Sequence, residues 1–476
     1  MKRYWDRRDF LKTVGAGMAA LPLARLGRAG AAPDKQPNII FIMADDMGYG
    51  DLGVYGQEHI QMPNVDQMAR EGIRYTDVYA GAPVCAPSRS VLMTGQHTGH
   101  TRVRGNMSNV EDHGAVACPF RGEGAWRVPL LEEDTTVADV LKEAGYVTGI
   151  TGKWGLGEAG TPGVPNKQGF DEWLGFLNQA RAHSYYPEYI WENQERLHLE
   201  GNTGTREDFD TEEVYVHDLF TDFALDFIER HGPEETPFFL YLPYTIPHAR
   251  WQIPELEPYT EDTDWSEEMK VYASMLTRMD RDVGRILDLL KELDIDEDTI
   301  VFFCSDNGAQ NRYEGGFDSS GPLRGHKRSL YDGGIRTVMV VRWPQVIEED
   351  AVSEDIWYFA DVLPTCAELA GVSPPEDIDG VSVLPSLLSQ PQPELEDRPL
   401  YWEFARGGDF KQAARRGKWK AVRQAHDAPI ELYDLSEDIG EENDIAEDHP
   451  IVVDWFERFF EEERTPSPSW PSPLDP

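Results

Sequence analysis

Cysteine is scarce in this sequence of 476 residues, with only four, at positions 85, 118, 304 and 366. No two of them form the close pair that binds structural zinc, and their number excludes a small disulfide-stabilised scaffold. Cys304 and Cys366 lie in apolar segments, which favours burial in a core. For Cys118 the pattern leaves both a free thiol and a disulfide open. Cys85 differs from the others because of its neighbours.

Positive charge is also in short supply. The chain has 44 Lys and Arg against 86 Asp and Glu, a formal net charge of -42. A surface of this sign repels nucleic acid and anionic membranes, so we expect neither as a partner. The simplest interpretation of the acidity is solubility at high ionic strength, where salt screens self-repulsion. A polyanion would bind only at a locally positive pocket.

Long apolar runs are missing as well. After the first residues, no segment reaches the roughly 20 apolar residues that a membrane span requires. The N-terminus has the layout of a twin-arginine signal, in which Arg7 and Arg8 precede a weakly apolar run and small residues at 29–31. We expect removal of residues 1–31, cleavage near Ala31, and export by the twin-arginine translocase to the periplasm or the medium. An N-terminal amphipathic anchor is the alternative.

Strand-like apolar runs alternate with amphipathic helical patterns through most of the chain. This alternation predicts an α/β fold with a buried, largely parallel sheet. The clearest predicted strands are residues 38–43, 237–242, 299–303 and 338–341. The predicted helices are residues 65–71, 136–144, 212–230, 267–293 and 361–369. We expect one main domain over residues 34–375.

The composition and pattern of the sequence change after about residue 375. Pro-rich linkers there separate short predicted strands at 400–404, 419–423 and 431–435, and a helix at 451–462 follows. This pattern predicts a smaller α+β subdomain over residues 376–464. Residues 465–476 contain five prolines and little to bury, so we expect a poorly ordered tail.

Two predicted strands end in oxygen ligands. Asp45 and Asp46 follow the strand at 38–43, and Asp306 and Asn307 follow the strand at 299–303. Open α/β sheets bind ligands at the carboxyl ends of their strands. Three carboxylates and an amide oxygen suit a divalent cation such as calcium. Either pair alone is weak, because Asp and Asn often end strands as turn residues.

The residues from 85 to 95 read Cys-Ala-Pro-Ser-Arg-Ser-Val-Leu-Met-Thr-Gly. This segment resembles the signature of the sulfatase family, in which Cys, any residue, Pro, a small residue and Arg precede a helix that runs toward Thr-Gly. Other segments match in family order from residue 37 to about 440. They are the Asp45-Asp46 strand, Gly152-Lys153-Trp154, Pro247-His248, Asp306-Asn307-Gly308, Lys327, and residues 331–336.

The resemblance implies both a fold and a chemistry. The fold would be an alkaline-phosphatase-like three-layer α/β domain with a central mixed, largely parallel sheet, plus the smaller C-terminal subdomain. The activity would be the hydrolysis of aryl or carbohydrate sulfate monoesters. A formylglycine-generating enzyme or an anaerobic sulfatase-maturating enzyme would oxidise Cys85 to formylglycine. The hydrated aldehyde would then attack sulfur, and sulfate would leave by elimination from a covalent intermediate.

The resemblance also implies roles for individual residues. The calcium ligands would be Asp45, Asp46, Asp306, Asn307 and the modified Cys85. Arg89 would stabilise the diol, and Lys153 and Lys327 would bind the sulfate oxygens. His248 would donate a proton to the leaving alcohol as the general acid. Gln179 would supply a further polar contact to the substrate.

The chain departs from the family pattern at one position. Where the family commonly reads Gly-Lys-Trp-His-Leu-Gly, this sequence has Gly155 in place of the histidine. The base for sulfate elimination is then unassigned. His97 and His100, which follow the helix after Cys85, are candidate substitutes. Among aromatic residues, Tyr185, Tyr186 and Trp251 are candidates to line a sugar-binding cleft, although ordinary packing is the commoner explanation.

Two other functions fit parts of the sequence. A phosphoester or phosphonate hydrolase of the same superfamily would bind a similar tetrahedral oxyanion. Phosphomonoesterases of that superfamily usually carry two zinc ions, however, and their extra histidine ligands do not stand out here. A non-catalytic binder of sulfated glycans is the second alternative, and it requires that Cys85 remain a thiol.

Overall fold

The computed structural model describes residues 35–111, 115–117, 126–202, 213–261, 264–310, 316–406 and 409–475. The twin-arginine segment and Cys118 lie outside the described residues. Within them, no helix is long and apolar enough to cross a membrane.

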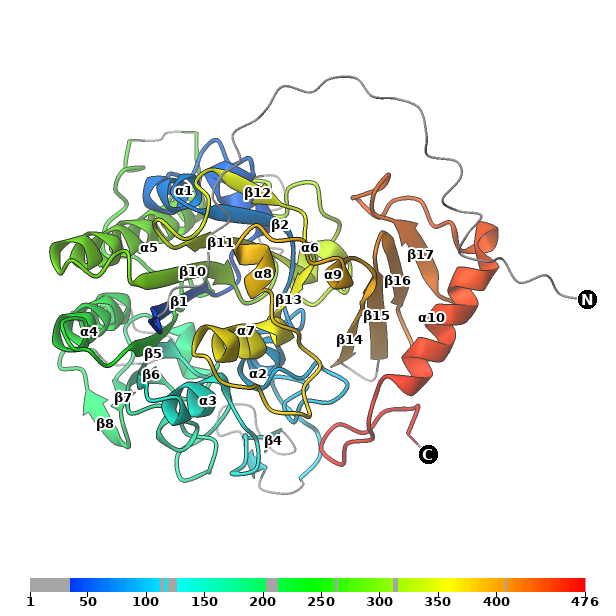
Figure 1. Ribbon diagram of the computed structural model, residues 1–476, viewed down its shortest axis with the longest axis horizontal. Helices are drawn as coiled ribbons and strands as arrows, with labels where there is room; N and C mark the ends of the chain where they lie inside the picture. The colour runs from blue at the N-terminus through cyan, green and yellow to red at the C-terminus, as the bar shows by residue number, and fades with distance from the viewer. Residues whose placement is uncertain are drawn as a thin grey trace, which may run out of the picture.

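A mixed sheet forms the centre of the molecule (Figure 1). In sheet order its strands are β12 (Ala351–Ser353), β2 (Ile73–Tyr79), β11 (Arg336–Arg342), β10 (Thr299–Ser305), β1 (Asn38–Ala44), β9 (Phe238–Pro243), β5 (Val147–Lys153), β6 (Glu172–Phe176), β7 (Tyr189–Glu192) and β8 (Glu195–His198), while β13 (Trp357–Tyr358) also pairs with β2. The five strands from β10 to β6 are mutually parallel, and β11 and β7 run antiparallel to their neighbours within this set. The predicted α/β fold with a largely parallel sheet is therefore confirmed.

Helices cover both faces of this sheet. Along β1, Ile39, Phe41 and Met43 belong to one buried cluster and the alternate residues belong to a second, as the two-residue period of a strand requires. The first cluster includes residues of α2 (Cys85–Thr94), α3 (Val137–Glu143) and α7 (Val362–Leu369). The second includes residues of α1 (Pro63–Arg70), α4 (Val216–His231) and α5 (Glu267–Glu292). The result is a three-layer helix–sheet–helix domain.

The four predicted strands correspond to β1, β9, β10 and β11, and the five predicted helices correspond to α1, α3, α4, α5 and α7. Their ends differ from the predicted ends by a few residues, as fraying at helix and strand termini leads one to expect. The other short strands and α-helices that precede the second sheet are β3 (Val116–Ala117), β4 (Trp126–Arg127), α6 (Asp332–Ile335), α8 (Leu384–Leu387) and α9 (Glu394–Asp397).

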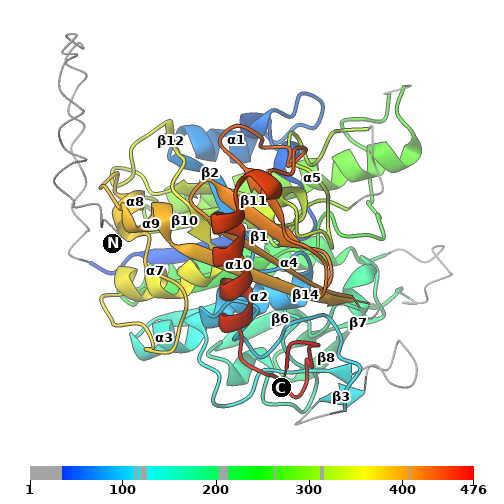
Figure 2. The ribbon, with the colours of Figure 1, turned by 90° about the vertical axis from the view of Figure 1, so that its right-hand side faces the viewer.

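A second, antiparallel sheet packs beside the main domain, at the right of Figure 1. Its strands are β14 (Pro399–Arg406), β15 (Asp409–Arg416), β16 (Trp419–Arg423) and β17 (Glu431–Asp434). Trp402 and Val422 join the core of the main domain, whereas Tyr401 and Leu432 pack against α10 (Pro450–Glu462) on the other face. Figure 2 shows α10 lying across the outer side of this sheet. The smaller C-terminal subdomain is therefore present, and β15 is a strand that the sequence pattern did not predict.

The end of the chain differs from the poorly ordered tail expected from its prolines. The backbone N–H of Thr465 donates to the Gly99 carbonyl at 3.1 Å, and the indole N–H of Trp470 donates to the Arg102 carbonyl at 2.8 Å. The Trp470 ring packs so closely over Gly105 that a Cβ there would lie 2.7 Å from it. The tail therefore lies against the loop after α2, because one aromatic side chain and its backbone groups find partners there.

Candidate active site

Parallel pairing brings four oxygen-bearing side chains together at one edge of the sheet. Ala44 of β1 pairs with Ser305 of β10, so the residues that follow the two strands are neighbours. Asp45, Asp46, Asp306 and Asn307 are all buried, each with at most 1% of its surface exposed. The backbone N–H of Asp46 donates to Asp306 Oδ1 at 3.2 Å. This is the arrangement that the two strand ends predict.

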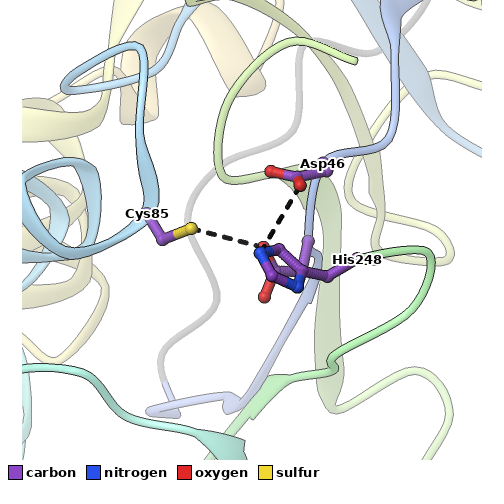
Figure 3. Close-up of side chains that lie close together, drawn as sticks. Asp46, Cys85 and His248 are labelled. Atoms are coloured by element: carbon purple, nitrogen blue, oxygen red, sulfur yellow. Dashed lines mark hydrogen bonds and ion pairs between the residues drawn. The ribbon is translucent and has the colours of Figure 1, made fainter. Parts of the chain in front are cut away.

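Cys85 is the first residue of α2 and faces this acidic cluster. Its thiol lies 3.5 Å from Asp45 Oδ1, and Lys327 Nζ lies 3.5 Å from the sulfur. Ligand atoms of Asp45, Asp46, Cys85 and His248 all lie within 4.8 Å of one another. In Figure 3 the side chains of Cys85 and Asp46 both point toward the imidazole of His248. Burial, followed by the charge of Asp45, raises the pKa of the Cys85 thiol to about 12.

Three buried cations face the three carboxylates. Arg89, one turn after Cys85, donates from Nε and Nη2 to Asp306 Oδ2 at 3.1 and 2.8 Å. Lys153, at the end of β5, lies with Nζ 2.5 Å from Asp45 Oδ2. Lys327 forms the corresponding ion pair with Asp46. Each carboxylate is thus matched by a buried cation.

The pKa values of the carboxyls follow from this pairing. Burial favours the neutral acid, but Lys153 and the neighbouring His248, Arg89 and Lys327 outweigh it and lower the pKa of Asp45. The pKa of Asp46 is lowered in the same way, against burial, chiefly by Lys327. For Asp306, burial and then the charge of Asp45 raise the pKa to about 6.

The donor set fits a hard divalent cation. Asn307 Oδ1 is buried and has no hydrogen-bond partner among the described residues, while its Nδ2 donates to Asp46 Oδ1 at 2.8 Å. An orphaned buried acceptor beside carboxylates is costly unless a cation binds it. Gln310, which sequence reasoning missed, donates from Nε2 to Asp46 Oδ2 at 2.5 Å and orients that carboxylate. The cluster is therefore capable of binding a metal ion.

His248 lies in the loop that follows β9. Its Nε2 is 3.7 Å from Asp46 Oδ2, which is an ion-pair distance and not a hydrogen bond. Its Nδ1 is buried without a partner among the described residues. Burial lowers the pKa of His248 well below its usual value of 6.5, despite the opposing charge of Asp45. The structure thus brings His248 together with the cysteine, as the sequence predicts.

Comparison with known proteins identifies this arrangement. The family model described as Sulfatase matches residues 37–372, and the model described as N-sulphoglucosamine sulphohydrolase, C-terminal, matches residues 325–455. The chain belongs to the sulfatase family. The resemblance seen in the sequence, and the sulfatase activity that it implies, are thereby confirmed.

Individual relatives match over most of their length. The N-acetylgalactosamine-6-sulfatase of Canis lupus familiaris is 35% identical over 416 residues, which is 85% of this chain and 74% of that protein. Human arylsulfatase A is 31% identical over 455 residues, covering 87% of this chain and 84% of the relative. Among solved structures, Ps i-CgsB in complex with k-i-k-neocarrahexaose has a TM-score of 0.77 and 28% identity, covering 92% of this chain and 93% of that one. The predicted fold class agrees with this structural neighbour.

Gly155 of this sulfatase leaves room that another side chain fills. Gly155 has a φ of +93°, and a Cβ built there would lie 2.4 Å from Gln179 Nε2. The Gln179 amide donates to the Gly155 carbonyl at 3.3 Å, and Arg127 donates to Gln179 Oε1. A histidine at position 155 would collide with this amide. Gln179 therefore occupies the place of the missing side chain, near Arg89, and its predicted contact with the substrate stays a prediction.

The two candidate substitute bases lie elsewhere in the sulfatase. His100 Nδ1 is 2.9 Å from Asp379 Oδ1, and His97 Nε2 is 3.3 Å from Glu463 Oε1. Both histidines follow α2, and a ten-residue helix is about 15 Å long. Among the described residues, neither histidine contacts Cys85. The structure does not bring them to Cys85, so the prediction from adjacency along the chain is corrected.

A different histidine lies beside the general-acid candidate. The ring of His183 meets that of His248 edge-to-face, with centroids 4.4 Å apart, and its Nδ1 is 2.7 Å from the Ala249 carbonyl oxygen. Burial, and then the charge of Lys153, lowers the pKa of His183 to about 4, so the ring is neutral near pH 7. Sequence reasoning missed this residue, because a single histidine beside an aromatic run has no periodicity or spacing to mark it.

The aromatic candidates for a sugar cleft differ in their contacts. The Tyr185 hydroxyl is buried and lies 2.5 Å from the Thr245 carbonyl and 3.0 Å from that of His248. The half-buried Trp251 donates from its indole N–H to the Pro247 carbonyl at 2.6 Å. Both side chains therefore hold the His248 loop in place. The ring of Tyr186, also buried, is tilted against that of Tyr215, with centroids 5.3 Å apart.

Proposed function

We propose that this sulfatase hydrolyses sulfate monoesters of carbohydrates with calcium and with a formylglycine made from Cys85. The observation that carries the proposal is the position of the Cys85 side chain at the head of α2, 3.5 Å from both Asp45 Oδ1 and Lys327 Nζ. A thiol with a pKa near 12 is a weak nucleophile at neutral pH. The same position suits oxygen atoms, because a carboxylate acceptor and an ammonium donor flank it.

The proposed calcium ligands are Asp45, Asp46, Asp306, Asn307 and the modified residue 85. A metal ion there would neutralise charge on the sulfate oxygens. A hydrated aldehyde at position 85 supplies one hydroxyl that can attack sulfur and a second whose deprotonation allows sulfate to leave. We propose that Arg89 fixes the positions of this group and of Asp306 relative to each other, since its guanidinium already binds Asp306 through two nitrogens.

The charge balance of the site supports an anionic substrate. Three buried carboxylates face three buried cations, Arg89, Lys153 and Lys327, so the protein groups alone are close to neutral. A divalent cation would leave an excess of positive charge in a site of low dielectric. That excess favours an incoming sulfate group, which gives a net-acidic protein a locally positive pocket for its substrate.

We assign the proton on the leaving alcohol to His248. A nitrogen of its imidazole lies within 4.8 Å of ligand atoms of Cys85 and Asp46. The loop that carries His248 is held by Tyr185 and Trp251. Asp46 Oδ2 lies 3.7 Å from Nε2, and its negative charge would favour the protonated imidazole once substrate is bound. Lys153 and Lys327 are the proposed donors to the sulfate oxygens, and Gln179 is a further polar contact.

The carbohydrate nature of the substrate rests on the relatives. One relative is named for a sulfated N-acetylgalactosamine, and a solved neighbour holds a neocarrahexaose.

We further propose export through the twin-arginine translocase to the periplasm or the medium. That route carries folded proteins, so a formylglycine-generating or anaerobic sulfatase-maturating enzyme would act on the chain before export.

The deciding measurement is the mass of the tryptic peptide that contains residue 85, taken from active protein of the native source. We expect an aldehyde in place of the thiol, and release of inorganic sulfate from sulfated sugars that stops when calcium is chelated. Active protein with an intact thiol would contradict the formylglycine. Faster hydrolysis of phosphate or phosphonate esters than of sulfate esters would favour the alternative hydrolase, and binding without turnover would favour a glycan-binding protein.

A further inference from the structure

Lys327 is carried by a closed loop, residues 324–333, which we call the Lys327 loop. The backbone N–H of Gly333 donates to the Arg324 carbonyl at 2.8 Å and closes the loop at its base. A Cβ at Gly333 would lie 2.3 Å from the Gly325 carbonyl oxygen, so only glycine permits this closure. Near the tip, the N–H of Lys327 donates to the Ala309 carbonyl at 2.8 Å. The loop therefore presents the Lys327 side chain to Asp46 and Cys85.

The base of the Lys327 loop is held by the C-terminal sheet. Arg324 Nη1 donates to the Tyr433 hydroxyl at 3.1 Å and to the Glu441 carbonyl at 2.5 Å. The guanidinium carbon of Arg324 lies 3.8 Å from the centroid of the Tyr331 ring. The Tyr331 hydroxyl donates to Glu431 Oε2 at 2.5 Å. Both arms of the loop are thus tied to β17 and the segment that follows it.

A buried charge network adds a second tie at Asp332, near the end of the loop. The backbone N–H of Asp332 donates to Glu441 Oε2 at 2.6 Å. Lys420 of β16 lies with Nζ 2.7 Å from Asp332 Oδ1 and 3.1 Å from Glu441 Oε1. The side chains of Lys420, Asp332 and Glu441 have no exposed surface. Such a network is rigid, because moving any member would leave a buried charge unpaired.

These contacts join the proposed sulfate site to a part of the chain that lies outside it. The lysine side chain has high rotamer entropy, so a loop lysine presents its charge at a defined place only when the backbone beneath it is held. We propose that the C-terminal sheet positions Lys327 for the sulfate group, with Arg324 and Tyr331 as positioning residues. This inference rests on the proposed function, in which Lys327 binds sulfate oxygens.

The positioning role of Arg324 can be measured as a change in the affinity for sulfate. Misplacement of a binding group by about 1 Å can cost up to roughly a hundredfold in rate. Loss of the Arg324 contacts should therefore weaken sulfate binding by at least about tenfold. It should do so only while Lys327 is present, because the tie acts through that residue.

The test uses the full mature chain with Cys85 as a thiol and with calcium added, so that binding is measured without turnover. The probe is inorganic sulfate, titrated calorimetrically into wild type, Arg324→Ala, Lys327→Ala and the double variant. Arg416→Ala is the matched control. Arg416 is a partly exposed arginine of β15, with its guanidinium carbon 4.7 Å from the centroid of the Trp455 ring and an ion pair to Asp397. Tyr331→Phe is a milder second variant that keeps the ring and removes the hydroxyl.

The proposal expects Arg324→Ala to weaken sulfate binding at least about tenfold in the wild-type background and not at all in the Lys327→Ala background. Tyr331→Phe should weaken binding by a smaller factor, and Arg416→Ala should leave it unchanged. Equal effects of Arg324→Ala in both backgrounds, or no effect, overturn the positioning role. If Lys327→Ala itself leaves sulfate binding unchanged, the proposed sulfate contact fails and the positioning role fails with it.

Discussion

Lys153 Nζ lies 2.5 Å from Asp45 Oδ2, and neither side chain has any exposed surface. The pair joins the end of β5 to the end of β1, two strands separated in the sheet by β9. A buried ion pair of this kind contributes little net stability against an apolar alternative, but loss of one partner leaves the other charged in a low dielectric. Loss of Lys153 should therefore affect both the stability of the fold and turnover.

Substitution of Lys153 by methionine separates these two consequences. We expect Lys153→Met to lower the free energy of unfolding by about 3 kcal/mol, because Asp45 loses its nearest cation. We expect kcat/KM to fall by about a hundredfold or more, because a donor to the sulfate oxygens is lost. Denaturant unfolding and steady-state kinetics measure the two effects. Lys142→Met is the control, since Lys142 and Asp171 form a half-exposed pair that should contribute less than about 1 kcal/mol. Equal losses of stability in the two variants would contradict the buried role.

Calcium should stabilise the folded protein through Asn307. A ligand present at a hundred times its Kd adds about 2.7 kcal/mol to the stability of the state that binds it. We expect calcium to raise the Tm of the wild type and to raise that of Asn307→Ala much less, because the buried Oδ1 acceptor is gone. Asn166→Ala, which removes hydrogen bonds near the surface, should leave the calcium response intact. An unchanged response in Asn307→Ala would exclude this residue as a ligand.

The strand ends and the cysteine segment could be predicted because each depends on a local pattern. Asp45 and Asp306 follow apolar runs that form adjacent parallel strands, and the register of β1 with β10 then places them together. Cys85 and Arg89 lie one helical turn apart on α2. For the strand ends, a short pattern and a rule of sheet geometry indicated the cluster. Cys85 and Arg89 were found instead through their resemblance to the sulfatase signature.

The parts that sequence reasoning did not find depend on contacts between distant segments. His183 contacts His248, which lies 65 residues later in the chain. His97 and His100 are close to Cys85 in sequence, but α2 separates them from it in space. Strand β15 has too many polar residues to match a strand pattern, yet Gln412 and Arg415 are buried there because each finds hydrogen-bond partners. Burial of satisfied polar side chains cannot be read from hydrophobic periodicity.

His183 rather than His100 should affect turnover. We expect His183→Ala to lower kcat/KM for a sulfate ester by at least about tenfold, because the neutral ring packs on His248 and holds the Ala249 carbonyl. His183→Asn keeps a donor for that carbonyl, so partial recovery would assign part of the effect to the hydrogen bond. His100→Ala should leave both the burst and the steady-state rate unchanged, since its partner is Asp379. A slower release step in His100→Ala would restore the base predicted from the sequence.

The pair of His100 and Asp379 should make stability depend on pH with a definite sign. The hydrogen bond to Asp379 raises the pKa of His100 above its ordinary value of 6.5, although burial opposes it. A raised pKa in the folded state contributes stability that is complete below the unfolded-state pKa and is lost as the pH rises through the folded-state value. The difference in Tm between wild type and Asp379→Asn should therefore be largest near about pH 5 and shrink toward about pH 9. A difference that stays constant across this range would mean that the His100 pair does not titrate with folding.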